Sequence, residues 1–341
     1  MGGRDHRFAE RRQPAQGRAH GAPRRVARRG RAPDHRIMSA PGTAIAAGRP
    51  AEQPVIGALM VSGSMLFIAA MDGFAKYLTQ RYPIIEIAWA RHFFHFVMLA
   101  PIVLWRYGVA ATIRPPQRGL QIRRSLFLLV STIFFFAGLS NTPIAETLAL
   151  AMVAPLVVTI LAPFLLGEHV GFRRLSAVTI GFLGALFIIK PGTDVFQWTA
   201  LFGLGSGFVY AFYIIATRRL AGTSPPLITL TFTALVGAAS TSAALPAVWV
   251  TPTLFDLAVM VGMAAMAMSG HLLVILAYER AEASKISAFA YSELIWATAI
   301  GYAAFGDFPD VWAWLGMAII CGSGVYISMR ERRVAAARSP G

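Results

Sequence analysis

Apolar runs long enough to cross a lipid bilayer recur along this chain from Pro54 almost to its C-terminus. A membrane-spanning helix needs roughly 20 predominantly apolar residues. Runs of this kind cover residues 54–77, 84–105, 123–140, 143–166, 173–190, 197–217, 226–248, 254–277, 285–305 and 311–329. Only 14% of the residues are charged, whereas soluble domains carry about 25%. The sequence therefore predicts an all-α polytopic membrane protein with ten transmembrane helices.

The N-terminal part of the chain has a different character. Residues 1–37 contain eleven Arg and three acidic residues, and residues 1–53 show no apolar periodicity. Without a hydrophobic segment this is not a signal peptide, and such a composition is typical of disorder. We expect Met38 to be the physiological start, so that residues 1–37 are not translated. The alternative is a basic tail that contacts anionic lipid.

The basic residues between the apolar runs predict how the chain is oriented. With the N-terminus placed inside, the external loops hold only Lys76, Arg81 and Lys190. The internal loops with their flanks, and the C-terminal tail (331–341) with the adjoining Arg330, hold Arg106, Arg114, Arg118, Arg123, Arg124, Arg173, Arg174, Arg218, Arg219, Arg280, Lys285, Arg330, Arg332, Arg333 and Arg338. The positive-inside rule then places both termini in the cytoplasm of a multi-pass inner-membrane protein. The net charge of +15 lies mostly in residues 1–37 and in these short loops. We therefore expect lipid and no nucleic acid as a partner.

The two halves of the chain resemble each other. Ala145-Glu146 opens the fourth run and Gly167-Glu168 closes it, while Ala281-Glu282 precedes the ninth run and Gly306-Asp307 closes it. This predicts two units of five helices, 54–190 and 197–330, which have opposite orientation because five is odd. Inverted repeats are typical of secondary transporters, with the substrate site near the midplane between the halves.

Two stretches of the sequence carry a family resemblance. PIAETLALAMVAPLVVTILAPFLLGEHVGFRRLSAVTIGFLGALFIIKPG and FAYSELIWATAIGYAAFGDFPDVWAWLGMAIICGSGVYISMRER resemble the two EamA repeats of the drug/metabolite transporter superfamily. The pattern is a fourth helix with a proline (Pro155) that ends in Gly-Glu, followed by a helix rich in glycine; Asp307 replaces the Glu in the second copy. The resemblance covers about residues 54–333 and is greatest to the branch of riboflavin and S-adenosylmethionine uptake proteins. It implies a central cavity lined by helices such as the first, third, fourth, sixth, eighth and ninth, with the fifth and tenth peripheral.

Glu293 is the leading candidate for a ligand contact. It lies about midway along the ninth run, and an unpaired charge at such a depth costs about 2.5–3.5 kcal/mol on the insertion scale. In a continuous helix Phe289, Glu293 and Trp296 share one face, since they are spaced i, i+4 and i+7. A carboxylate between aromatic rings suits a cationic or planar heteroaromatic ligand or a proton relay; a structural hydrogen bond is the alternative. Tyr291 is a further candidate on this segment.

Other polar residues inside the apolar runs extend the candidate site. Asp72 and Arg91 lie at similar depth on adjacent helices, which favours an ion pair that is either functional or structural. We expect Glu168 and Asp307 to be anchors or gate contacts, since they close the equivalent fourth and ninth helices. Further candidates, each of which packing could also explain, are Tyr210, Tyr213, Ser269, His271 and Ser131.

The most consistent interpretation is a secondary transporter that moves a small organic metabolite by alternating access, either uptake of riboflavin or an adenosyl compound, or export of amino acids, metabolites or drugs. A nucleotide-driven motor is excluded by the absence of a GxxxxGK[ST] loop. An intramembrane serine enzyme would need Ser206 paired with His271, and nothing resembles the selectivity filter of a channel. We expect no enzyme activity, no cofactor and no metal site, since His92 and His95 lack further ligands. Both a monomer and a homodimer are compatible with the sequence.

Overall fold

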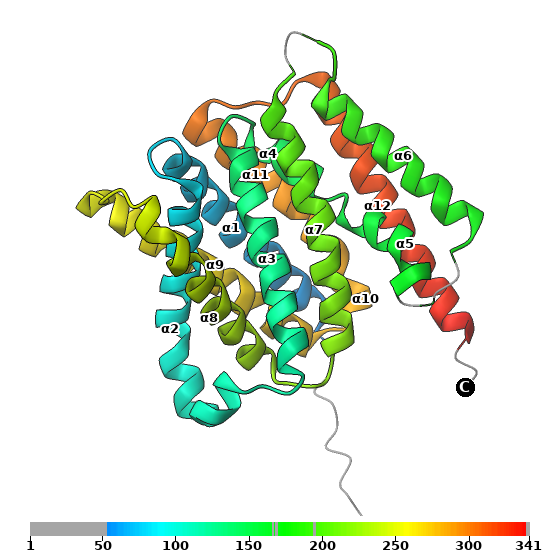
Figure 1. Ribbon diagram of the computed structural model, residues 1–341. Helices are drawn as coiled ribbons and strands as arrows, with labels where there is room; N and C mark the ends of the chain where they lie inside the picture. The colour runs from blue at the N-terminus through cyan, green and yellow to red at the C-terminus, as the bar shows by residue number, and fades with distance from the viewer. Residues whose placement is uncertain (1–52, 166, 168–169, 194–195, 339–341) are drawn as a thin grey trace, which may run out of the picture. The chain divides into compact units, whose positions relative to one another are not determined.

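The computed structural model describes residues 53–165, 167, 170–193 and 196–338, with no strand in these ranges. Its elements are α1 (Pro54–Thr79), α2 (Ile84–Ile113), α3 (Arg118–Leu139), α4 (Ile144–Ala151), α5 (Ala154–Leu165), α6 (Phe172–Ile189), α7 (Trp198–Leu220), α8 (Pro226–Ala244), η1 (Leu245–Ala247), α9 (Leu254–Arg280), α10 (Ala283–Ile286), η2 (Ser287–Tyr291), α11 (Ser292–Phe305) and α12 (Val311–Arg338) (Figure 1). Residues 1–52, with Met38, and Glu168 lie outside the described residues. The predicted all-helical fold is confirmed, and α12 continues into the segment expected to be the tail.

Nine helical segments within these ranges are long and apolar enough to cross a membrane, and one of them, Ile144–Leu165, consists of α4 and α5 together. The ninth expected span, 285–305, is not one continuous helix: α10 is followed by the 3₁₀ segment η2 and then by the 14-residue α11. In a 3₁₀ turn side chains at i and i+3 eclipse. Ala288 and Tyr291 therefore face the same way, and both line the cavity described below.

The fourth span is interrupted as well, between α4 and α5. Met152 and Val153 separate the two helices, just before Pro155. Proline has no N–H to donate to the carbonyl four residues earlier, here that of Ala151, and it breaks the helical ladder. The break thus lies just before Pro155, whereas Pro163 lies inside α5 without ending it.

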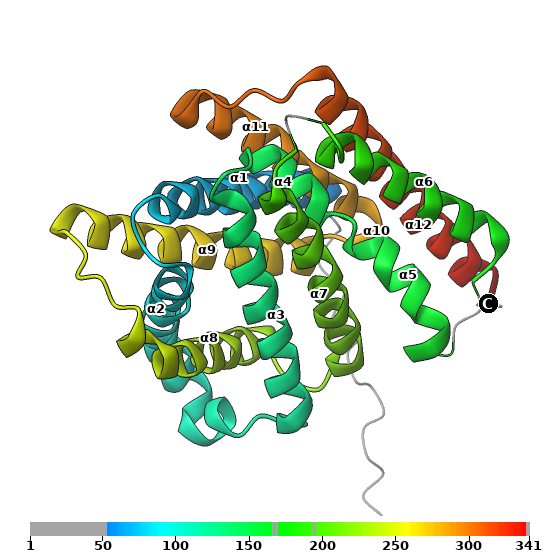
Figure 2. The same cartoon turned by 45° about the horizontal axis from the view of Figure 1, so that its top comes forward.

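The helices pack in pairs: α1 with α9, α3 with α7, α2 with α8, and α6 with α12 (Figures 1 and 2). Helices α1 and α9 are antiparallel, because Gln53 N–H donates to the Arg280 carbonyl at one end (3.1 Å) and Tyr77 Oη donates to Asp256 at the other (3.0 Å). We refer to these as the Arg280 end and the Asp307 end of the bundle, since Asp307 contacts α1 beside Tyr77, at Lys76.

Large apolar side chains cover the outer surface of the bundle. Trp105, Phe164 and Leu254 are more than 80% exposed, which would be costly in water. In a bilayer the same side chains contact lipid, and aromatic residues favour the interface. Together with the long apolar helices, this surface indicates a multi-pass membrane protein.

Gly207 is required for the close approach of α7 to the break between α4 and α5. A Cβ at this position would lie 2.6 Å from the Ala151 carbonyl oxygen and 2.7 Å from Val153 Cγ2. Gly203, four residues earlier, has a similar approach to Thr147, as the spacing of the two glycines predicts.

We expect Gly207→Ala to lower the free energy of unfolding in detergent by about 1–3 kcal/mol, because overpacking forces the backbone apart. Gly119→Ala on α3 is the matched control, since nothing lies within 4 Å of its Cβ position. Thermal unfolding of both variants tests the contact. Equal thermal unfolding midpoints for Gly207→Ala and Gly119→Ala would contradict a close contact at Gly207.

Candidate functional site

A cavity of about 610 Å³ lies inside the bundle. Its walls come from both halves of the chain, mainly from α1, α3, α4, the start of α5, α7, α9, η2 and α11, with Arg91 from α2 and residues 325–329 of α12. Helix α6 contributes no lining residue in the described part of the chain. The lining therefore agrees with the helices that the family resemblance implies, except for Arg91 on α2 and for the contribution of α12.

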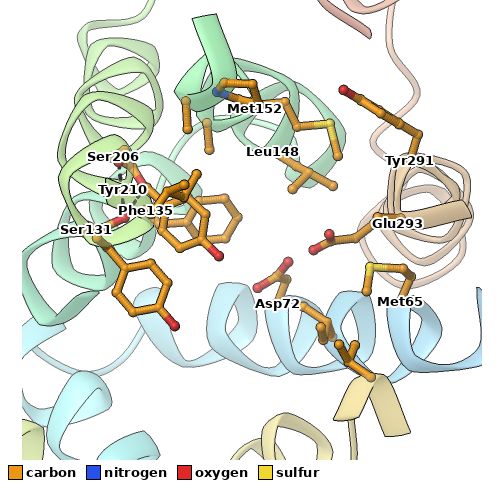
Figure 3. Close-up of a pocket in the computed structure, with 18 of the residues that line it drawn as sticks. Met65, Asp72, Ser131, Phe135, Leu148, Met152, Ser206, Tyr210, Tyr291 and Glu293 are labelled. Atoms are coloured by element: carbon orange, nitrogen blue, oxygen red, sulfur yellow. Dashed lines mark hydrogen bonds between the residues drawn. The ribbon is translucent and has the colours of Figure 1, made fainter. Parts of the chain in front are cut away.

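Eight of the predicted site residues line this cavity. They are Glu293, Tyr291, Tyr210, Tyr213, His271, Ser131, Asp72 and Arg91. Figure 3 shows that the carboxyl groups of Asp72 on α1 and Glu293 on α11 point toward each other. Among the described residues neither carboxyl group accepts a hydrogen bond from the protein, so both remain available to a ligand.

Arg91 does not form the expected direct ion pair with Asp72. Its Nη1 instead donates to Thr132 Oγ1 on α3 (2.8 Å), and Arg91 as a whole is 9% exposed. Thr132 was not identified from the sequence, since a threonine in an apolar helix gives no signal of this role. Arg91 still lines the cavity, together with Asp72.

Two stacked tyrosine rings form an aromatic wall on α7. The ring centroids of Tyr210 and Tyr213 lie 5.0 Å apart. The Tyr213 hydroxyl accepts a hydrogen bond from Arg124 Nη2 (2.7 Å), and the Arg124 guanidinium carbon lies 4.5 Å from the Tyr213 ring centroid. Arg124 thus holds the Tyr213 ring in place through a hydrogen bond and a cation–π contact.

Ser131 and Ser206 join α3 to α7 at the cavity wall. Their hydroxyl oxygens are 3.0 Å apart, and Ser131 Oγ also donates to the Ser206 carbonyl (3.1 Å). His271 Nδ1 donates to the carbonyl of Ala267 on its own helix (2.6 Å). Ser206 is therefore bonded to a serine and not to His271, and the pairing that a serine enzyme would need is not formed.

Three predicted residues lie elsewhere. The Trp296 indole N–H donates to the carbonyl of Ser62 on α1 (3.1 Å), Phe289 is 46% exposed, and Ser269 is half-buried outside the lining. The expected stripe of Phe289, Glu293 and Trp296 is not formed, because the 3₁₀ segment η2 changes the turn between Phe289 and Glu293.

No group of three His, Cys, Asp or Glu among the described residues could hold a metal ion.

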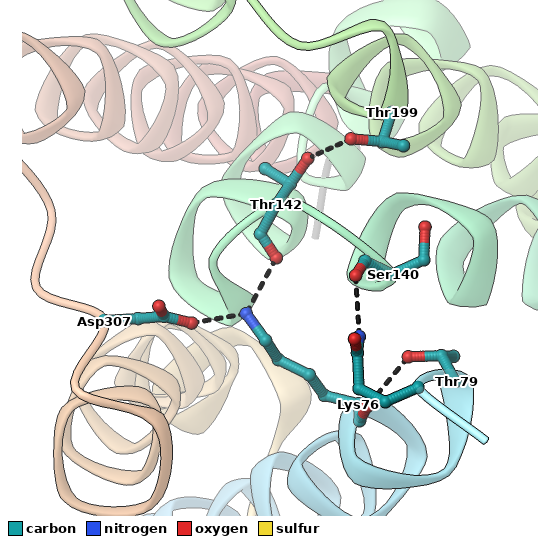
Figure 4. A network of polar contacts seen from close by, with 7 residues as sticks. Lys76, Thr79, Ser140, Thr142, Thr199 and Asp307 are labelled. Atoms are coloured by element: carbon teal, nitrogen blue, oxygen red, sulfur yellow. Dashed lines mark hydrogen bonds and ion pairs between the residues drawn. The ribbon is translucent and has the colours of Figure 1, made fainter. Parts of the chain in front are cut away.

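Asp307 takes part in a polar network that holds one end of the bundle together. The Lys76 ammonium group pairs with the Asp307 carboxylate and donates to the carbonyl of Thr142 (3.1 Å), and the Thr142 hydroxyl contacts that of Thr199 (2.8 Å) (Figure 4). This network joins α1, the turn before α4, the start of α7 and the loop after α11. Lys76 was read from the sequence only as a topology marker.

A second ion pair lies at the same end, between Lys190 and Asp310. The hydrogen bond from Lys190 lowers the pKa of the Asp310 carboxyl group below its ordinary value. This pair is more exposed than the pair of Lys76 and Asp307. It joins the end of α6 to the loop before α12.

The cavity extends toward the opposite end. Its lining includes Ser287 and Ala288, just after α10, and Ser328 and Met329 near the end of the apolar part of α12. Toward the Asp307 end, the lining described on α4 begins only at Leu148. The lining thus reaches toward the Arg280 end, while the Lys76 network joins the helices at the other end of the bundle.

Comparison with known proteins identifies related chains. The EamA-like transporter family matches residues 55–190 and 197–329. An S-adenosylmethionine uptake transporter of Rickettsia bellii is 28% identical over 79% of this chain and 92% of its own length. Riboflavin transporters of Rhizobium johnstonii and Vibrio cholerae are each 28% identical, over 82% and 83% of this chain and 93% and 98% of their own lengths.

A solved crystal structure shows the same fold. It superposes with a TM-score of 0.56 over 82% of this chain and 98% of its own, at 18% identity. This likeness concerns the fold alone.

Proposed function

The chain belongs to the EamA-like transporter family, and we propose that this small-metabolite transporter works by alternating access, with the central cavity as its substrate site. The observation that carries the proposal is the cavity itself. It is about 610 Å³ in volume and is lined from both halves of the chain. The carboxyl groups of Asp72 and Glu293 face each other in it (Figure 3), and neither accepts a hydrogen bond from the residues that the structure describes. A cavity of this size suits a small organic molecule.

The proposed mechanism uses two inverted five-helix repeats and ten membrane crossings. The ninth of these crossings would be the broken segment α10–η2–α11. Supporting this, both interrupted segments, α4–α5 and η2–α11, contribute to the cavity, and discontinuous helices at the substrate site are frequent in transporters built from inverted repeats. The backbone groups freed at such breaks are tolerated where they face a cavity.

The proposed orientation follows from the basic residues. The positive-inside rule places the Arg280 end in the cytoplasm together with both termini, in the inner membrane. The cavity would then face inward in this structure, with the Lys76 network as the closed outer gate. The proposed substrate is riboflavin or an adenosyl compound, because the named relatives carry these.

We expect Ala288→Trp to block transport without unfolding the protein. Ala288 is exposed and lines the cavity, so an indole there occupies space that the substrate needs. A loss of about tenfold or more in apparent affinity, or about 1.4 kcal/mol, is expected. The measurement is uptake of labelled S-adenosylmethionine and riboflavin into proteoliposomes.

The matched control is Ala299→Trp on α11, because Ala299 is exposed but lies outside the cavity. It should transport like the unmodified protein. If Ala288→Trp also transports normally, the cavity is not the substrate path. If the unmodified protein transports neither compound, the proposed substrates are wrong.

A further inference from the structure

Two acidic side chains meet in the cavity beside one basic side chain. Asp72 and Glu293 face each other (Figure 3), and Asp72 is 2% exposed. Arg91 is the one Lys or Arg among the lining residues that the structure describes. With both carboxyl groups ionised, these three side chains would leave the cavity with one uncompensated negative charge.

No other group in the lining supplies a permanent positive charge. The remaining titratable groups there are Tyr210 and Tyr213 from α7, His271 from α9 and Tyr291 from η2. The lining residues described on α3, α4, α5 and α12 carry no titratable side chain. His271 already donates Nδ1–H to Ala267, and Arg91 is bonded to Thr132.

Ionising both of two facing carboxyl groups in a weakly polar interior is unfavourable in free energy. Their mutual repulsion makes the pair release its protons in two separate steps. Arg91 compensates one charge, so the empty cavity is stable when the pair keeps one proton. A ligand with a positive charge between the two carboxyl groups can take the place of that proton, whereas a neutral ligand leaves it bound.

We propose that the cavity selects an organic cation with a planar aromatic group, and that binding of this cation releases the proton shared by Asp72 and Glu293. The stacked rings of Tyr210 and Tyr213 offer a surface for the planar group. This proposal rests on the proposed function and narrows it. Of the compounds named for the relatives, an adenosyl sulfonium carries a positive charge beside an aromatic base, while a flavin carries none.

The test compares two ligands that differ in this charge. S-adenosylmethionine and S-adenosylhomocysteine share the adenosine and amino-acid groups, but only the first has a charged sulfonium. Isothermal titration of the full-length protein in buffers of different ionisation enthalpy measures both affinity and proton release. We expect S-adenosylmethionine to bind about tenfold more tightly and to release about one proton, with an affinity that rises as pH increases.

Glu293→Gln should abolish both the preference and the proton release while S-adenosylhomocysteine still binds. Asp72→Asn should act in the same way, which guards against a folding defect of either variant. Asp310→Asn is the control acid outside the cavity and should bind like the unmodified protein.

Equal affinity for the two ligands, or tight binding without proton release, would overturn the proposal and leave the transporter intact. Riboflavin as the preferred ligand would overturn it too. By contrast, if the unmodified protein neither binds nor takes up S-adenosylmethionine or riboflavin, the substrates named in the proposed function are themselves wrong.

Discussion

Lys76→Met is expected to open the bundle at the Asp307 end. The substitution keeps much of the volume of the side chain but removes the ammonium group. That group pairs with Asp307 and donates to the Thr142 carbonyl, and it lies 5.3 Å from the centroid of the Phe305 ring. Asp307 and the carbonyl would then lose a partner at the point where three segments meet (Figure 4).

The expected size of the effect follows from burial. The Lys76 side chain is 10% exposed and that of Asp307 28%, so the pair is only partly screened by solvent. Removing one partner of a buried pair costs more than the pair itself contributes, because the other charge stays behind. A difference of about 1.4 kcal/mol between the closed and open states already changes the open population tenfold.

Labelling of a buried cysteine measures this opening. Leu148 lies in the part of the lining nearest the Asp307 end and is 6% exposed, so Leu148→Cys in a Cys321→Ser background reports access from that side. With a membrane-impermeant maleimide, we expect Lys76→Met to raise the labelling rate about tenfold.

Lys190→Met is the matched control for the Lys76 experiment. The side chains of Lys190 and Asp310 are 17% and 50% exposed, and an exposed pair contributes about 0–1 kcal/mol. The control should label nearly as slowly as the unmodified protein. Equal rates for the two lysine variants would show that the Lys76 network is an ordinary surface contact and not a gate.

Much of this architecture follows from simple sequence patterns. Long apolar runs predict the helices, because only helices and closed barrels satisfy backbone groups in lipid. Isolated acids in such runs predict interior positions, because a charge facing lipid is costly. For this reason Asp72 and Glu293 were expected in the interior, and the structure places both in the cavity.

The details that sequence patterns missed depend on contacts between distant segments. Neither Pro nor Gly marks the 3₁₀ segment η2, so a continuous helix with Phe289 and Trp296 beside Glu293 was the simplest expectation. Asp256 was not singled out either, although it accepts hydrogen bonds from Tyr77 and Tyr82, more than 170 residues away. Hydropathy describes one helix at a time and carries no information about such partners.

The contacts of Arg124 were also missed by the sequence pattern. Substitution of Arg124 gives the second large expected effect. Its position at the edge of an apolar run indicates a loop residue that orients the chain. In the structure it is 7% exposed and donates to Thr217 (2.7 Å) and Thr233 (2.8 Å) as well as to Tyr213. One side chain therefore joins α3, α7 and α8 and supports the tyrosine wall.

We expect Arg124→Met to lower the free energy of unfolding by about 1.5–3 kcal/mol, the range for a hydrogen bond to a charged group. It should also weaken substrate binding, because Tyr213 loses the guanidinium group behind its ring. Arg124→Lys should rescue little, since an ammonium group cannot reproduce the planar fork of donors. Thermal unfolding and ligand titration of the purified variants measure the two effects separately.

The neighbouring residue supplies the control. Arg123 is exposed, so Arg123→Met changes the same charge at the same depth without breaking the network. If both methionine variants unfold and bind alike, the charge near the end of the helix is what matters and the contacts of Arg124 are incidental. If only Arg124→Met is impaired, an arginine that the positive-inside rule assigns to topology also shapes the cavity wall, and basic residues at other helix ends of this chain need the same test.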